Sequence, residues 1–375
     1  MAVAFFLLVF TLCATNYLLH HLKFYRGLKQ LRHGTATDHP SVSIIIPARN
    51  EATSIGHCLD SLLNQNYPQE KVEIIVVDDH STDSTAAIVH HYQNTYQHIH
   101  CIRLNDPAIH PSPKKYAITT AISLSQHDII ITTDADCTMP PNWLKTLTSH
   151  FKNDTGVVAG WVAMNPDSEK TLFHKIQALE FLSLVITGAG AIGAGFPIIA
   201  NGANLAYRKS VYNEVNGFEG IDHLVSGDDD LFIQKVARQT AWRIRSAWEH
   251  DATVRTTAVN SFGAFIRQRT RWASKGVHYE SSRIVWYLVS VYIFYVGLFI
   301  GIPVSIFNFP KLTLPFYLFS LKLSIDGLVM WRGLTLAGRR DLIRFFLPAM
   351  LFQIPYIILV GFIGLFGNIS WKEHK

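Results

Sequence analysis

The stretch SVSIIIPARNE at residues 41–51 opens with a short run of mostly β-branched residues that a proline ends. A second run, EIIVV at residues 73–77, is followed by two aspartates, and apolar residues recur at helical spacing between the two runs, over residues 55–63. Runs that are continuously apolar, rather than alternating, are typical of strands buried on both faces of a parallel sheet. Residues 41–77 therefore predict a strand–helix–strand unit.

The same alternation continues beyond this unit. Further strands are expected at residues 101–104 and 128–133, and further helices at residues 81–89, capped by Ser81, and at residues 114–124. Strands that alternate with helices predict an α/β fold with a doubly wound, Rossmann-like, mostly parallel sheet. Ligands of such sheets bind beyond the carboxyl ends of the strands.

Acidic side chains lie just past the expected strand ends. Asp78 and Asp79 follow the second strand, Glu51 comes shortly after the first, and Asp134 and Asp136 follow the fourth. In an extended backbone residues i and i+2 point the same way, so the last two should face one ligand. Carboxylates crowded at one edge of a sheet repel one another unless a cation intervenes.

A divalent cation suits this arrangement. Magnesium and manganese take oxygen ligands, typically one or two protein carboxylates, and substrate phosphates complete the coordination shell. The sequence therefore predicts a Mg²⁺ or Mn²⁺ site at Asp134 and Asp136 that also binds a nucleotide diphosphate. Taken alone, an Asp-x-Asp pair is more often a solvated turn or a helix cap.

The chain also carries apolar stretches of membrane-spanning length. Residues 1–20 are nearly all apolar, and similar stretches lie at residues 284–309, 312–331 and 345–366. They predict an N-terminal anchor and, within residues 284–369, three C-terminal transmembrane helices. An apolar stretch at residues 181–200 contains several glycines and a proline. It is interpreted as an interfacial or buried helix and loop, because a span there would put the two halves of the candidate site on opposite sides of the membrane.

Basic residues predict the orientation of these helices. Four follow the first apolar stretch, namely Lys23, Arg26, Lys29 and Arg32, and four lie between the last two stretches, namely Arg332, Arg339, Arg340 and Arg344. Because positive residues stay inside, the domain at residues 40–260 is expected in the cytoplasm and the tail at residues 371–375 outside. The chain would then be a multi-pass protein of the cell (inner) membrane. A cleaved signal peptide is the alternative for residues 1–20, but its positive charges would precede the apolar core.

The amino-acid composition also indicates the class of protein and its compartment. An apolar fraction of 49% with only 16% charged residues is typical of a chain with a membrane portion. The four cysteines form no Cys-x-x-Cys pair, which fits a reducing compartment and argues against a zinc ribbon. The net charge of +5 is explained by the basic flanks of the apolar stretches, so nucleic acid is not expected as a partner.

Six short motifs occur in order along the middle of the chain. They are IPARNE at 46–51, VDDHS at 77–81, Lys114 with Ala117, DAD at 134–136, SGDDDL at 226–231 and QRTRW at 268–272. With them, residues 40–275 resemble a membrane-bound family 2 glycosyltransferase, related to cellulose, chitin and hyaluronan synthases and to ceramide glucosyltransferases. The resemblance implies the GT-A fold of nucleotide-diphospho-sugar transferases and a hexosyltransferase-like activity at the cell envelope.

The resemblance also implies roles for individual residues. The nucleotide would be bound by Pro47, Arg49, Glu51, Asp78, Asp79, Lys114 and Asp134, and the metal by Asp134 and Asp136. The acceptor and the diphosphate would meet Asn201, Asn204, Gln268, Arg271 and Trp272. Aligning on Asp230 selects Asp228 as the general base. Because Gly227 stands where the family usually has an acid, Asp229 remains the alternative.

Two of these assignments have structural alternatives. Residues 261–283 are expected to form an interfacial amphipathic helix, whose spacing puts the glutamine, arginine and tryptophan of the QxxRW motif on one face. As a membrane-surface helix it would turn Arg267, Arg269 and Lys275 outward. For residues 201–204 the alternative to an acceptor site is a strand edge and turn.

The expected function is metal-dependent, inverting transfer of a sugar from a nucleotide-diphosphate donor, with a UDP-sugar favoured, to a membrane-associated lipid or lipid-linked glycan. A processive polysaccharide synthase subunit and a non-catalytic membrane scaffold are the alternatives. A nucleotidyltransferase would need a Gly-rich phosphate loop after the first strand, and residues 47–50 do not form one. Membrane lipids and a partner protein for export are the further partners expected.

Overall fold

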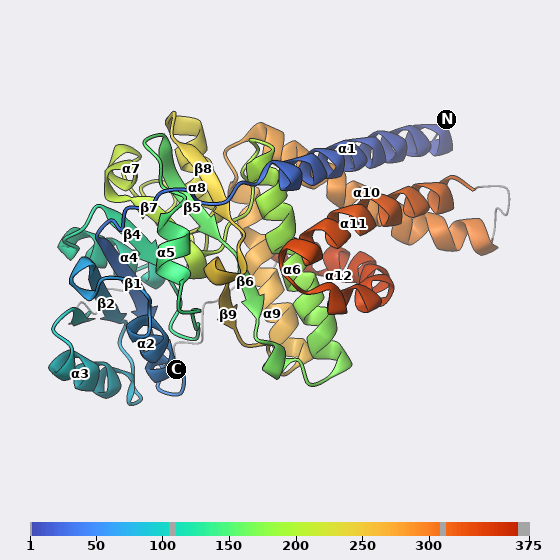
Figure 1. Ribbon diagram of the computed structural model, residues 1–375. Helices are drawn as coiled ribbons and strands as arrows, with labels where there is room; N and C mark the ends of the chain where they lie inside the picture. Colours follow the sequence, from blue (N-terminus) through green and yellow to red (C-terminus); the bar gives the residue numbers. More distant parts are fainter. Residues whose placement is uncertain (1, 105–109, 308–312, 367–375) are drawn as a thin grey trace.

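The computed structural model describes residues 2–104, 110–307 and 313–366. An α/β domain forms one end of the molecule, and long helices extend from it to the other end (Figure 1). The expected external tail at residues 371–375 lies outside the described residues.

The α/β domain is built on a seven-stranded sheet with the strand order β3-β2-β1-β4-β7-β5-β8. The pairs β2–β3, β1–β2, β1–β4 and β5–β8 are parallel, and β7 runs antiparallel to β4 and β5. The strands are β1 Val42–Ala48, β2 Val72–Asp78, β3 Ile99–Arg103, β4 Ile129–Thr132, β5 Thr155–Gly160, β7 Leu205–Arg208 and β8 Arg243–Ala247. The predicted mostly parallel, Rossmann-like sheet is confirmed.

The central strands are apolar on both faces, because helices cover the sheet on each side. Ile44 and Ile46 of β1 pack with α2 on one face of the sheet, and Ile45 packs with α4 on the other. The helices of this domain are α2 Ile55–Leu63, α3 Thr85–Thr95, α4 Pro113–Leu124, α5 Trp143–Thr148, α7 Lys209–Glu214 and α8 Asp230–Gln239. The strand order changes direction at β1, between β2 and β4, and the crevice beside such a point is where α/β sheets bind ligands.

A small second sheet pairs β6 with β9 in parallel, next to the main sheet. These strands are β6 Val162–Met164 and β9 Val254–Thr256.

The predicted cap of the second helix is wrong. Helix α3 begins at Thr85, and the Asp83 carboxylate accepts the Thr85 N–H at 2.9 Å. The Ser81 hydroxyl instead accepts the Asn50 N–H at 3.0 Å, and so ties the loop after β2 to the loop after β1.

The glycine-containing apolar stretch belongs to α6, Leu172–Gly193, and to the loop behind it. Strand β4 precedes α6 in the sequence and β7 follows it, yet the two strands are direct neighbours, with Ile131 opposite Ala206. Both ends of α6 therefore connect to neighbouring strands of the same sheet. This geometry agrees with an interfacial or buried helix rather than a span.

Among the described residues, five helices are long and apolar enough to cross a membrane, judged by length and composition. They are Ala4–Gln30, Leu172–Gly193, Ser282–Phe307, Leu314–Leu336 and Arg340–Leu365. They correspond to α1 Ala2–Gln30, α6, α10 Ser282–Phe307, α11 Leu314–Leu336 and α12 Phe346–Phe366. Helices α1, α10 and α11 pack side by side and extend away from the sheet, while α6 and α9, Phe262–Ala273, run across them in Figure 1.

Candidate active site

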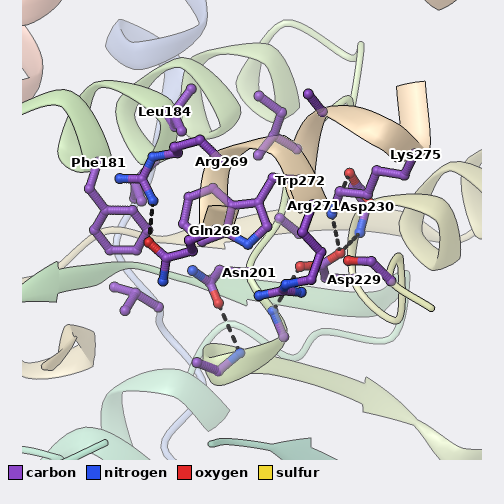
Figure 2. A pocket seen from close by; sticks show the side chains of 18 of the residues that line it. Phe181, Leu184, Asn201, Asp229, Asp230, Gln268, Arg269, Arg271, Trp272 and Lys275 are labelled. Atoms are coloured by element: carbon purple, nitrogen blue, oxygen red, sulfur yellow. Dashed lines mark hydrogen bonds and ion pairs between the residues drawn. The ribbon is translucent and has the colours of Figure 1, made fainter. Parts of the chain in front are cut away.

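A cavity of about 780 Å³ lies beyond the carboxyl ends of β1 and β4 and continues between the long helices; Figure 2 shows part of its lining. Its volume is in the range typical of ligand pockets. Most of the predicted site residues line this cavity: Pro47, Arg49, Glu51, Asp79, Lys114, Asp134, Asp136, Asn201, Asp228, Asp229, Gln268, Arg271 and Trp272. The fold thus gathers motifs that are far apart in the sequence.

Lys114 connects two of the acidic groups. Its Nζ lies 2.8 Å from Asp134 Oδ1 and 3.0 Å from Asp228 Oδ2, so two distant segments share one ammonium group. Burial disfavours the charged form, but Asp134 and then Asp228 raise the pKa of Lys114 above its ordinary value. The predicted metal ligand and the predicted base therefore lie at the same point of the cavity.

Asp134 and Asp136 lie in a turn, not in the extended backbone that the sequence suggests. The Cys137 N–H donates to the Asp134 carbonyl at 3.2 Å, and the Thr256 hydroxyl donates to Asp136 Oδ2 at 3.2 Å. Both carboxylates nevertheless line the same cavity. Burial, followed by the negative charges of Asp134 and Glu51, raises the pKa of Asp136 above its ordinary value. A cation would relieve this crowding.

These residues fit a magnesium or manganese ion that binds together with a diphosphate. Within the described part of the chain, no group of three or more His, Cys, Asp or Glu side chains is placed to hold a metal by itself. The cavity offers two neighbouring carboxylates, Asp134 and Asp136. Ions of this kind are commonly held by one or two carboxylates, with substrate phosphates as the remaining ligands.

Gly227 accounts for the departure from the family pattern before Asp228. Its φ is +95°, a conformation that favours glycine, and a Cβ there would lie 2.3 Å from Leu231 Cδ1. An acidic side chain at position 227 would be strained and would clash. The acidic side chains of this segment are therefore those of Asp228, Asp229 and Asp230.

The contacts of the three consecutive aspartates differ. Asp229 accepts the Gly202 N–H at 3.3 Å and the Asp230 N–H at 2.7 Å, and it pairs with Lys275 at 3.1 Å. Asp230 pairs with Lys275 at 2.9 Å (Figure 2). Burial raises the pKa of Asp230 to about 7. Burial also opposes the charge on Asp229, but Lys275 and the hydrogen bonds from Asp230 lower the pKa of Asp229 below its ordinary value.

Gly202 allows the loop before β7 to lie against Asp228. A Cβ at position 202 would lie 2.5 Å from Asp228 Oδ2 and 3.4 Å from Lys114 Nζ. The Thr132 hydroxyl, at the end of β4, donates to the Gly202 carbonyl at 2.8 Å and fixes this approach. Asn201, next to Gly202, lines the cavity beside the aspartates.

Asn204 does not belong to the acceptor site. Its side chain is fully buried, donates to the carbonyls of Trp161 (2.7 Å) and Ala252 (2.8 Å), and accepts from Trp143 Nε1 (3.0 Å). Asn204 holds the start of β7 in place. This agrees with the alternative given for residues 201–204, a strand edge and turn. Asn204 does not face the cavity, because every hydrogen bond of its side-chain amide is directed into the core.

Asp78 does not line the nucleotide pocket either. It is the last residue of β2, its side chain is fully buried, and Oδ1 accepts the Ser81 N–H at 3.3 Å. Oδ2 lies 3.7 Å from Arg103 Nε. The adjacent Asp79 takes the cavity-facing position.

Helix α9 presents Gln268, Arg271 and Trp272 to the cavity, as the motif predicts. The outward orientation predicted for Arg269 and Lys275 is wrong. Arg269 is only 2% exposed, because α12 packs against α9 and Glu180 of α6 binds the guanidinium. Lys275 pairs with the aspartates of the site. Figure 2 shows Arg269 and Lys275 among the residues that line the pocket.

Glu180 of α6 is a site residue that the sequence reasoning missed. It accepts hydrogen bonds from Arg269 Nε at 3.0 Å and from the Tyr356 hydroxyl of α12 at 2.8 Å. Arg269 in turn donates to Gln268 Oε1 at 2.6 Å, and its guanidinium lies 4.1 Å from the Trp272 ring. The available signal was a lone carboxylate in an apolar helix, since such a group is rarely buried without a partner.

Lys115 was also missed. Its ammonium group, buried beside Lys114, donates to the carbonyls of Ile221, Leu224 and Ser226 at 2.6 to 2.8 Å. Lys115 therefore holds the loop that leads to Asp228.

Comparison with known proteins adds independent findings. The Glycosyl transferase family 2 model matches residues 43–215. The chain is 26% identical over 332 residues to the probable glycosyltransferase YdaM of Bacillus subtilis, covering 83% of this chain and 75% of that protein. It is 30% identical over 239 residues to a beta-monoglucosyldiacylglycerol synthase of Synechocystis, covering 64% of this chain and 48% of that protein.

A solved structure shows the same architecture over nearly the whole chain. It is the mannosyltransferase PcManGT from Pyrobaculum calidifontis in complex with GDP-Man and Mn²⁺, which is 20% identical, covers 97% of this chain and 99% of its own, and superposes with a TM-score of 0.59. This likeness concerns the fold, and the family match concerns the segment from β1 to α7 that carries the DAD motif. Residues 43–215 therefore form a family 2 glycosyltransferase domain with the GT-A fold, and the protein is a glycosyltransferase.

Proposed function

We propose that this glycosyltransferase is metal-dependent and inverting, and that it moves a sugar from a nucleotide-diphosphate donor, with a UDP-sugar favoured, to a lipid or lipid-linked glycan at the membrane. The observation that carries the proposal is the continuity of one cavity. Asp134 and Asp228 line it together with residues of α1, α10 and α12, which are long and apolar enough to span a membrane. An acceptor held among these helices would meet the donor at the carboxylates.

Asp228 is assigned as the general base. It would take the proton of the acceptor hydroxyl as that oxygen attacks the anomeric carbon from the side opposite the diphosphate, which inverts the configuration. Its side chain borders the cavity between Lys114 and Gly202. Asp229 is less suited, because two backbone amides and Lys275 already engage its oxygens.

The donor is assigned to the part of the cavity next to β1. Pro47, Arg49 and Glu51 line it after this strand, and Arg49 Nη1 lies 3.6 Å from Asp79 Oδ2. Asp134 and Asp136 would hold the metal, which when bound neutralises the charge of the departing diphosphate. The Mn²⁺ and GDP-Man in the complex of the structurally similar mannosyltransferase support this assignment.

Arg271 is assigned to the diphosphate as well. It lines the cavity, and burial lowers its pKa below the ordinary value while Asp228 and Asp134 act in the opposite direction. A guanidinium group recognises phosphate oxygens with paired, charge-assisted hydrogen bonds.

The domain is assigned to the cytoplasmic face of a multi-pass protein of the cell (inner) membrane. Arg339, in the basic loop between α11 and α12, donates to both carboxylate oxygens of Glu169 at 2.8 and 2.7 Å. The loop and the α/β domain therefore lie on the same side. Basic loops are retained in the cytoplasm, which supports this orientation.

A donor panel tests the proposal. Membranes containing the full chain are incubated with radiolabelled nucleotide sugars, in Mn²⁺ or in EDTA, and the products are separated into lipid and polysaccharide fractions. We expect metal-dependent incorporation from one donor into the lipid-associated fraction. Incorporation that persists in EDTA would contradict the proposal, and label found only in polysaccharide would favour a processive synthase.

A further inference from the structure

The deep part of the cavity is an apolar chamber among the long helices. We use this name for the space lined by Leu184 and Val185 of α6, Leu288 and Val291 of α10, and Ile357 and Val360 of α12. The chamber and the candidate catalytic residues belong to one cavity, and Trp272 of α9 lines it too. Whatever fills the chamber can therefore extend to Asp228.

The polar residues at the end of the chamber are bonded to one another. Tyr17 of α1 donates its hydroxyl hydrogen bond to Asp326 of α11 at 2.7 Å, and Tyr295 of α10 donates to Gln353 of α12 at 2.9 Å. Lys322, which is fully buried, donates to Asp326 at 2.7 Å. Because these polar groups are hydrogen-bonded to one another, the two tyrosines present mainly ring carbons to a ligand. The chamber therefore suits an apolar ligand.

The helices close on one another beyond the chamber. On α1 the described lining reaches no further toward the N-terminus than Tyr17, and on α10 it ends at Tyr295. Phe10 of α1 and Phe294, next to Tyr295, are buried in one cluster, and a Cβ on Gly297, beyond Tyr295, would lie 2.3 Å from the Phe10 ring. Over the residues that the structure describes, the lining therefore ends part-way along α1 and α10, where these helices pack closely, and this suits a single bound molecule.

We propose that the apolar chamber binds the hydrocarbon chain of the acceptor, which is a single lipid molecule with a hydroxyl-bearing headgroup. The headgroup lies beside Trp272, with its hydroxyl toward Asp228, and the chain lies between α6, α10 and α12. This assignment rests on the proposed transferase function and names its acceptor class. It follows from the apolar lining, the close packing of α1 and α10 beyond it and the continuity with the candidate base.

Two valines of α10 supply a matched pair of variants. Val291 lines the chamber, whereas Val289, two residues away, does not line it and is 41% exposed on the surface of the helix. Val291→Trp fills the chamber, and Val289→Trp adds the same bulk outside it. Leu184→Trp, on α6, is a second filling variant in case Val291→Trp does not fold.

Photolabelling tests occupancy without requiring turnover. The full chain is placed in phosphatidylcholine vesicles with a long-chain alcohol that carries a diazirine in its chain, and labelled peptides are identified after irradiation. We expect chamber residues of wild type and Val289→Trp to be labelled, and chamber labelling in Val291→Trp to fall about tenfold, as for a site lost to overfilling. Chamber labelling that is equal in all three proteins, or absent from wild type, would overturn the proposal.

Transfer to lipid separates this inference from the proposed function. With a total lipid extract of the source organism as acceptor, Val291→Trp should lose about tenfold in lipid product, a loss of about 1.4 kcal/mol, while Val289→Trp keeps it. Melting temperatures of the two variants establish that both are folded. If wild type transfers no sugar, the proposed function fails; if wild type and Val291→Trp transfer equally to lipid, only the chamber assignment fails.

Discussion

The three aspartates at positions 228 to 230 are neighbours in sequence but have different surroundings. Asp228 meets Lys114 at the cavity, and Asp229 is fixed by two amides and by Lys275. We expect Asp228→Asn to keep nucleotide binding and to lower the rate of transfer by about 100-fold or more, as loss of a general base does. The measurement is kcat for transfer, with nucleotide affinity measured in parallel.

Asp229→Asn is the matched control for that prediction. It should lower the melting temperature, because it weakens the pairing with Lys275, and should lower transfer less than Asp228→Asn does. If Asp228→Asn retains transfer and Asp229→Asn loses it, the general base is Asp229 and not Asp228.

Asp230 gives a prediction about pH. Its pKa is raised to about 7 by burial, so between pH 4 and 7 the folded protein holds a proton that the unfolded chain has released. Stability from this group is present at low pH and is lost as pH rises through this window. We expect Asp230→Asn, which stays neutral, to reduce the fall in melting temperature between about pH 4 and pH 7. An unchanged or steeper fall would contradict the assignment.

At the scale of elements, Glu180 connects α6, α9 and α12 beneath the cavity. Glu180→Gln leaves Arg269 buried without its counter-ion, next to Gln268 and Trp272. Breaking a buried ion pair costs about 3–5 kcal/mol, part of which should appear as disorder at the acceptor side of the site. We expect KM for the acceptor to rise about tenfold in Glu180→Gln, with KM for the donor unchanged. Trp272→Ala, which removes the ring next to Arg269, should have the same effect.

Glu169→Gln is the control for this element. Glu169 is also nearly buried and pairs through both oxygens with Arg339, but it does not line the cavity. Its loss should lower stability and leave KM for the acceptor unchanged. Equal shifts in the acceptor KM of Glu169→Gln and Glu180→Gln would show that Glu180 acts through general stability rather than by positioning α9.

Strands β1, β2 and β4 could be predicted because each contains a continuous apolar run. Strand β3, IHCIR, is interrupted by His100 and begins two residues before the strand expected at residues 101–104. Strands β5 and β8 could not be predicted, for different reasons. The sequence of β5, TGVVAG, contains Gly156 and ends with Ala159 and Gly160, which are residues of low strand preference. Strand β8, RIRSA, carries Arg243 and Arg245, which pair with Asp154 beside the sheet. Their strand conformation depends on partners that are distant in the sequence.

The residues of the candidate site could also be predicted only in part from the sequence. Motifs predicted which residue types gather at the strand ends, and Asp134, Asp136 and Asp228 do line one cavity. They could not predict side-chain direction, since Asn204 turns toward Trp143 in the core. Arg269 was misplaced because helix periodicity alone does not reveal that a carboxylate of α6 covers that face.

At the scale of the whole molecule, the long helices are anchored to the α/β domain. The pairing of β4 with β7 keeps both ends of α6 on one side, and Arg339 binds the basic loop to Glu169 of the domain. The cavity is lined both by residues that follow the strands of the sheet and by residues of α1, α10 and α12. Under the proposed function, an acceptor held among these helices would meet the donor at the carboxylates.

The proposed mechanism requires a divalent cation between Asp134, Asp136 and the diphosphate of the donor. The most direct measurement is the electron paramagnetic resonance signal of free Mn²⁺, titrated with the purified full chain, with and without UDP or GDP, for wild type and for Asp136→Ala. We expect wild type to remove the free signal when its nucleoside diphosphate is present and Asp136→Ala to do so at least about tenfold more weakly. Equal Mn²⁺ binding by the two proteins, or equally tight binding of the diphosphate by wild type in EDTA, would contradict this mechanism.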